Sequence, residues 1–322
     1  MRTYLTRRLL LMIPVFIGIS IIIFTLIHLA PGNPYVYLLE ADPTITPEDY
    51  ERLLNSIGYY DPLYIKYFKW LGQILQGNLG YSIVDKQQIA ATMARRINNT
   101  LLLSVSALVL GTVISVPLGV FSSVRQYSMG DTVLTVLALL GISIPGFFLA
   151  LLLVKFLAFD LGWFPIQGRM TVNSGFTGMT LFYDQMRHMF LPLFVMTITQ
   201  LTSRMRYTRA SMLEIINQDY IRTARSKGLS ERTIIYKHAL RNALIPVVTI
   251  LSISLGSLLS GAMLIENVFM WPGMGRLIYT SITNRDYPVV MATTLLLAIM
   301  MLLANLLADI AYAVVDPRIR YD

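Results

Sequence analysis

The sequence predicts an all-α integral membrane protein with six transmembrane helices. Of its 322 residues, 55% are hydrophobic and only 14% are charged, whereas a soluble domain usually carries about a quarter charged residues. The charges are unevenly spread, and the long uncharged stretches are typical of membrane spans. The chain has no cysteine, which excludes disulfides, thiolate metal sites and cysteine nucleophiles.

The predicted spans are apolar runs near the ~20 residues that a helix needs to cross a bilayer. They are Leu9–Leu29, Leu101–Phe121, Val133–Val154, Met189–Ser203, Ala243–Ile265 and Val289–Ala308. The first run follows basic residues, as a secretory signal does, but it is longer than a signal's apolar region, so we expect a retained span, with a cleaved signal as the weaker alternative. The fourth run is short and must borrow length from its flanks, where Arg187 and Arg204 could snorkel to the two interfaces.

The net charge of +8 is consistent with this topology. The loops on one side of the six spans, residues 1–8, 122–132, 204–242 and 309–322, hold 15 Lys and Arg against 7 Asp and Glu. The loops on the other side, residues 30–100, 155–188 and 266–288, hold 11 of each kind. The positive-inside rule therefore predicts that both termini are cytoplasmic, and the basic excess does not require a nucleic-acid partner.

Three parts are expected along the chain. Residues 1–30 hold the N-terminus and the first span, and residues 31–100 form an extracytoplasmic insertion. A helical pattern near Leu63–Leu75 predicts that the insertion contains a small amphipathic subdomain. Residues 101–322 form the transmembrane domain, with a basic cytoplasmic loop at about 204–242.

Several kinds of chemistry are disfavoured by what the sequence lacks. No Gly-Lys dipeptide occurs, so a P-loop for ATP is excluded, and the three histidines are too scattered for a helical zinc site. Ion-coupled transporters usually carry ionisable residues inside their spans, whereas here such residues lie at span ends (Lys155, Asp160, Glu266, Asp309). An ion-coupled transporter acting alone is still one alternative, and a scaffold whose basic loop binds anionic lipid is another.

Hydroxyl and amide side chains within the spans usually connect one helix to another. Ser143, Gln200 and Ser257 are candidates for lining a polar pathway. Pro145 is a further candidate, because a proline kink flanked by glycines could form a gate, although prolines are common in membrane helices.

The basic loop contains a segment, residues 219–232, that the pattern predicts to be two helices joined by a turn. Gly228 is suited to end the first helix, and Arg225 and Lys227 suit the negative end of its dipole. On composition alone, a solvated charged loop without a partner is the simpler interpretation.

Beyond the turn, Ser230 can cap a second helix that runs to about Ala243. Ala224 and Gly228 are four residues apart, so we expect one side of the turn to be bare enough for another protein to approach closely.

This segment resembles the EAA loop of ABC-importer permeases, whose pattern is Glu-Ala-Ala, three residues, Gly and a distal Leu-Pro. Arg222-Thr223-Ala224 stand at the first three positions and Gly228 at the glycine. The first position departs from the general pattern, and Arg241 replaces its proline. Both departures resemble the dipeptide/oligopeptide (and nickel) permeases, whose run is similar to Asp219–Pro246 here.

Other matches to that family extend along the whole chain. They are Pro31–Pro34, Gly77–Ser82, Ser143–Pro145, Trp271–Arg276, Arg285–Val289 and Asp316–Arg320. Asn33 and Asn78 stand where the family usually has aspartate. Taken by themselves, Pro31–Pro34 and Trp271–Arg276 are expected to end helices and anchor them at the interface. The long first external loop resembles that of the B-type permease subunit.

The resemblance implies a type I ABC importer fold in a bacterial inner membrane, surrounded by lipid. It implies a homologous C-type permease subunit, an extracytoplasmic substrate-binding protein and two cytoplasmic ATPases that bind ATP and Mg. This chain would then be a transport subunit, neither enzyme nor metal protein, importing peptides or else nickel chelates or another small solute. The residues implied to meet the ATPases are Arg222, Thr223, Ala224, Arg225, Lys227, Gly228, Leu229, Ser230 and Glu231.

Overall fold

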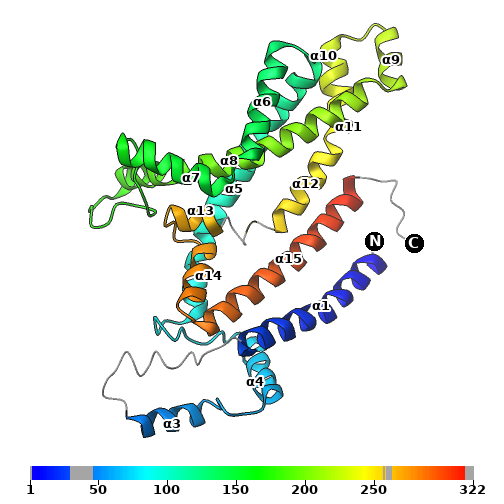
Figure 1. Ribbon diagram of the computed structural model, residues 1–322. Coiled ribbons are helices and arrows are strands. Elements are labelled where there is room, and N and C mark those ends of the chain that lie inside the picture. Colours follow the sequence, from blue (N-terminus) through cyan, green and yellow to red (C-terminus); the bar gives the residue numbers. More distant parts are fainter. Residues whose placement is uncertain (1, 30–45, 257, 259–262, 316–322) are drawn as a thin grey trace. The chain divides into compact units, whose positions relative to one another are not determined.

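The computed structural model describes residues 2–29, 46–256, 258 and 263–315 (Figure 1). The regular structure of these residues is helical, apart from one antiparallel bridge between Tyr81 and Gln88, which confirms the all-α prediction. The helices are α1 (Arg2–Leu29), α3 (Pro47–Ser56), α4 (Leu63–Leu75), α5 (Ile89–Val124), α6 (Met129–Ser143), α7 (Gly146–Leu153), α8 (Gly178–Ile216), α9 (Asp219–Ser226), α10 (Glu231–Thr233), α11 (Leu240–Ala243), α12 (Ile245–Gly256), α13 (Met263–Val268), α14 (Met274–Thr283) and α15 (Tyr287–Val315). Two π-helical segments, Val154–Asp160 and Ile234–Ala239, follow α7 and α10.

Three described helices are long and apolar enough to cross a membrane. They are Thr6–Leu29 within α1, Ile89–Val124, and Tyr287–Leu307 within α15. Two bent helix pairs, Met129–Ser143 with Gly146–Asp160 and Glu231–Ala243 with Ile245–Ser254, raise the number to five if each pair is one span. The remaining predicted span, 189–203, lies inside α8, so the predicted cytoplasmic loop 204–242 begins within a helix that continues to Ile216.

The third predicted span, 133–154, is a broken element and not the single kinked helix that we expected. Its two halves are bent by 97°. Ile144 has extended backbone (φ −89°, ψ 117°), and Pro145 precedes the first residue of α7. Proline has no N–H and disfavours helical backbone at the residue before it, so the first helix ends at this point.

The chain forms two compact units, residues 1–97 with 277–302 and residues 98–276 with 303–322. In the first unit, α1, α4 and α15 contribute side chains to one apolar core. Its members include Ile23 and Phe24 of α1, Tyr67, Trp70 and Ile74 of α4, and Met291 and Leu295 of α15. The helix predicted at 63–75 is therefore confirmed, and it packs on two long helices.

A buried carboxylate holds the segment before α5 to the start of α15 within the first unit. Asp286 is only 3% exposed. It accepts hydrogen bonds from the Ser82 hydroxyl and from the Ile83 N–H, the latter at 3.2 Å. Ser82 Oγ in turn accepts the Asp85 N–H at 2.8 Å. Two sequence motifs noted above, 77–82 and 285–289, thus meet at one contact.

In the second unit, the indole of Trp271 lies inside an apolar core. Its side chain is 1% exposed and packs in a cluster with Leu103, Val195 and Ile265. Its Nε1–H donates to the Asn99 carbonyl at 3.0 Å, so burial leaves no polar group unpaired. Helix α13 ends at Val268, just before this segment, as expected for a motif that ends a helix, and the burial of Trp271 adds a packing role that the sequence did not predict.

The same segment encloses the carboxylate of Glu266, which is 1% exposed in α13. The carboxylate accepts the Thr100 hydroxyl at 2.8 Å and the Arg276 N–H at 3.1 Å. A Cβ at Gly273 would collide with this carboxylate, and one at Gly275 would lie 2.7 Å from Met263 Cα. The two glycines of the motif therefore make room for a buried acid.

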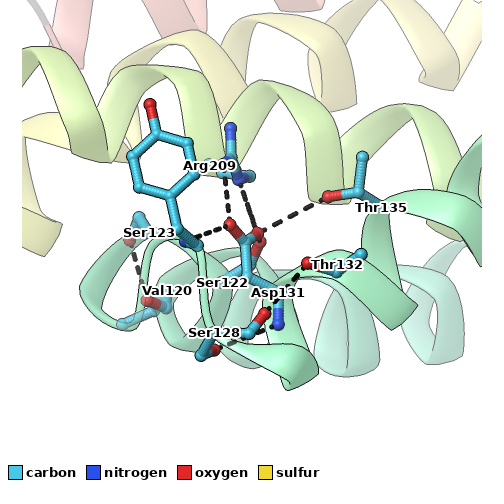
Figure 2. A network of polar contacts seen from close by, with 9 residues as sticks. Val120, Ser122, Ser123, Ser128, Asp131, Thr132, Thr135 and Arg209 are labelled. Carbon is cyan, nitrogen blue, oxygen red and sulfur yellow. Dashed lines mark hydrogen bonds and ion pairs between the residues drawn. The ribbon is translucent and has the colours of Figure 1, made fainter.

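An ion pair joins α5, α6 and α8 near the end of α8 (Figure 2). Asp131, buried in the first turn of α6, accepts Arg209 Nε–H and Nη2–H, each at 3.0 Å. The Ser122 hydroxyl of α5 and the Tyr127 N–H, at 3.0 Å, donate to the same carboxylate. A bidentate pair of this kind is stronger and more directional than a single contact, so it fixes the three helix ends together.

We expect Asp286→Ala to destabilise the protein by about 1–3 kcal/mol, because the Ser82 hydroxyl and the Ile83 N–H then lose their acceptor. Thermal unfolding of the detergent-purified protein measures the change, followed as the loss of the monodisperse peak in size-exclusion chromatography after heating. Asp85→Ala is the matched control, since that side chain is exposed and only its backbone N–H joins the contact. Equal stability of the two variants would contradict this role of Asp286.

Asp131→Asn should also lower stability, by about 1–3 kcal/mol, because Arg209 then loses a charged, bidentate acceptor. Asp219→Asn removes the acid of an exposed Asp–Arg pair, whose Nη1–Oδ1 distance is 3.5 Å, and should change stability little. Chemical denaturation of both variants in the same detergent compares the two pairs. A loss as small for Asp131→Asn as for Asp219→Asn would rule out a structural role for the buried pair.

Candidate functional site

The segment after α8, residues 217–243, has the predicted helix–turn–helix form, and we call it the turn segment. Its first helix, α9, ends at Ser226, and Gly228 follows with φ +77°, a conformation that favours glycine. Ser230 Oγ accepts the Thr233 N–H at 3.4 Å and so begins the second helical run. That run continues through α10, a π-helical segment and α11 to Ala243, as predicted.

The inner face of the turn segment is apolar and packs against the long helices of its own unit. One cluster contains Ile221, Ala224, Ile234, Ala239 and Ala243 of the segment, together with Val120 of α5 and Met212 of α8. Ala224 is only 9% exposed. The expectation that Ala224 and Gly228 share a bare face is therefore wrong for Ala224, which anchors the segment instead.

The outer face holds the other residues that the resemblance implied. Arg222, Thr223, Arg225, Lys227, Gly228, Leu229, Ser230 and Glu231 are all exposed. Gly228 lies in open space, because a Cβ built there would meet no atom within 4 Å. The residue pattern did predict this opening.

A contact that the sequence did not predict closes the turn across Gly228. Arg225 Nε–H donates to Glu231 Oε1 at 2.8 Å, which links the end of α9 to the start of α10. The Asn242 amide donates to the Tyr220 hydroxyl at 2.9 Å and adds a second link between the two helical runs. The turn segment is thus held from inside by apolar packing and from outside by polar contacts, and its tip is open.

A second candidate site is a cavity of about 550 Å³ in the second unit, lined by parts of α5, α7, α8, α12 and α13. Of the predicted pathway residues, Gln200 lines this cavity. Ser143 does not line it, and its hydroxyl donates to the Leu139 carbonyl at 2.9 Å. Pro145 does not line it either, although the next residue, Gly146, does. Ser257 lies outside the described residues, as do the motifs at 31–34 and 316–320.

Arg204 also lines the cavity, and the prediction that it snorkels to an interface is wrong. Its side chain is buried in the second unit beside Ser254 of α12, with Nη2 at 3.4 Å from the serine Oγ. A Cβ at Gly111 of α5 would lie 3.1 Å from Arg204 Nη1, so the glycine makes room for the guanidinium. The sequence signal was the spacing of Gln200 and Arg204, which puts both on one helix face.

No group of three or more His, Asp or Glu that could hold a metal occurs in the described part of the chain. The two candidate sites are thus a surface open to a partner and a mostly apolar cavity that contains a few polar side chains.

Comparison with known proteins places the chain among transport components. Residues 115–321 match the family model of the binding-protein-dependent transport system inner membrane component, and residues 1–104 match its N-terminal model. The chain is 42% identical over 322 residues to the oligopeptide transport system permease protein AppB of Bacillus subtilis (strain 168), covering 100% of both chains. It is 38% identical to the dipeptide transport system permease protein DppB of Escherichia coli (strain K12), covering 100% of this chain and 99% of that one.

The fold is similar to that of solved structures as well. An inward-facing structure of the MetNI methionine ABC transporter superposes with a TM-score of 0.54 at 19% identity, covering 70% of this chain and 96% of that chain. Identity this low shows the shared fold alone, whereas the two family models match residues 1–104 and 115–321 and the curated relatives align over the whole chain. The chain therefore belongs to the family of binding-protein-dependent transport system inner membrane components.

Proposed function

We propose that this chain is one of two permease subunits of an ATP-driven importer of short peptides. A homologous C-type permease would complete the pathway, a substrate-binding protein would deliver the cargo, and two cytoplasmic ATPases would bind ATP and Mg and supply the energy. The observation that carries the proposal is the turn segment, which is open at Gly228 and packed on α5 and α8.

The turn segment is suited to receive movement from an ATPase. A partner that binds more tightly in one conformation shifts the permease toward that conformation only if its contacts differ between the two states. The exposed residues 222–231 would make those contacts, and the cluster of Ile221, Ala224 and Met212 would carry the displacement into α8. The opposite side of the membrane would hold the substrate-binding protein, with both termini of this chain in the cytoplasm.

The cargo is proposed from the relatives. Their names specify oligopeptides and dipeptides, and a further relative, 35% identical over 100% of this chain, is a glutathione transport system permease protein. All three names denote peptides or a peptide derivative, which favours short peptides over nickel chelates or other small solutes.

Gly228→Trp should abolish peptide uptake, because a large side chain at the open tip would keep an ATPase from approaching. Gly77→Trp is the matched control, because Gly77 has φ +79° and is also open, so the two substitutions impose similar backbone strain. Co-purification of the ATPases with the permease, together with uptake by cells that express the whole importer, tests the prediction.

We expect the Gly228 variant to insert into the membrane normally and to lose its ATPases, whereas the Gly77 variant keeps them. Retention of the ATPases and of uptake in Gly228→Trp would refute the coupling role. Uptake driven by an ion gradient in liposomes without ATPases would refute the proposed importer as a whole.

A further inference from the structure

The cavity of the second unit holds an arginine for which the described residues that line the cavity supply no acidic partner. Arg204 is 2% exposed. Its Nε and Nη1 find no hydrogen-bond acceptor among the described residues, and its Nη2 has only the 3.4 Å contact to Ser254 Oγ. No Asp or Glu is among the described residues that line the cavity, so Arg204 is the one charged side chain there.

Such a guanidinium needs an anion. Burial of an isolated charge is costly unless the charge is paired, and an arginine has five N–H donors in a planar fork that fits a carboxylate. Asp131, Glu266 and Asp286 show that the described chain otherwise supplies its buried charges with hydrogen-bond partners. The donors of Arg204 that lack such partners are therefore available to a group that enters the cavity.

A second polar group in the cavity fits the rest of a peptide. Gln200 lies one helical turn before Arg204, and its buried Oε1 has no donor among the described residues. An amide oxygen in this position can accept a peptide N–H. Ser104, Thr199 and Ser203, together with apolar residues such as Phe147 and Met196, form other parts of the lining.

The cavity also has a suitable size. Its volume of about 550 Å³ falls within the ~300–1,000 Å³ that is usual for small-ligand sites. An apolar wall with a few polar groups would hold a short peptide by its C-terminal carboxylate and a main-chain N–H while tolerating different side chains.

We propose that Arg204, assisted by Gln200, binds the C-terminal carboxylate of the peptide cargo as it passes through the permease. This inference rests on the proposed function, because it assigns a substrate contact to the same importer. It predicts that the permease itself prefers peptides with a free C-terminal carboxylate, in addition to any selection by the substrate-binding protein.

The test uses the complete importer in proteoliposomes and two labelled probes, trialanine and its C-terminal amide. Arg204→Gln should lower the initial uptake rate of trialanine about tenfold or more, since charge-assisted hydrogen bonds are lost, and should change uptake of the amide little. The substrate-binding protein is the same in every sample, so its own preference cancels when each variant is compared with the wild type.

Arg206→Gln is the matched control. Arg206 lies two residues further along α8, is exposed and does not line this cavity, so its loss should alter uptake of both probes equally. Arg204→Lys keeps the charge but loses the fork, and it should shift the preference in the same direction by a smaller factor. This variant tests the proposal if Arg204→Gln does not assemble with its partners.

Each other outcome overturns the inference in a recognisable way. Equal loss of both probes in the Arg204 variants would show that the arginine serves the structure or assembly of the importer and does not bind the carboxylate. An unchanged preference would show that the cargo does not meet Arg204. Absence of uptake of both probes by the wild type would overturn the proposed peptide import, and the carboxylate site with it.

Discussion

A charge among apolar helices has little water to solvate it, so the protein itself must supply its partners. This constraint organises both units of the chain. Asp286 accepts a hydrogen bond from Ser82 and so fixes the start of α15. Glu266 accepts hydrogen bonds from Thr100 of α5 and from the Arg276 N–H, which holds the segment after α13 against α5. Asp131 of α6 pairs with Arg209 of α8. In each case the acid determines where the backbone can lie.

The two candidate sites differ in how completely their polar groups are hydrogen-bonded within the described chain. In the turn segment every strong contact faces inward or runs across the turn, so the exposed tip can meet a partner without losing its own shape. In the cavity, the hydrogen-bonding groups of Gln200 and Arg204 are incompletely used by the described chain. A rigid outer surface suits transmission of movement, whereas incompletely bonded inner groups suit a transient occupant.

Local features of the sequence predicted local structure well. The bounds of α4, the end of α9 before Gly228 and the cap at Ser230 all follow from side chains that are close in sequence. Asp131 and Arg209 are distant in sequence, as are Ser82 and Asp286, and one sequence does not show which distant groups pair. The direction of Arg204 was mispredicted because the space for it comes from Gly111, on another helix.

The continuity of α8 has a mechanical consequence. Gln200, Arg204 and Met212 all lie on this helix, and the stretch from Gln200 to Ile216 contains no proline or glycine. At 1.5 Å of rise per residue, Arg204 and Met212 are about 12 Å apart along its axis. A helix without a kink transmits a displacement of one end to the other end with little bending. In the proposed mechanism, a displacement of the turn segment by the ATPases would move α8 and would carry the Arg204 guanidinium by a similar distance. A carboxylate bound to Arg204 would then be released in the same conformational change.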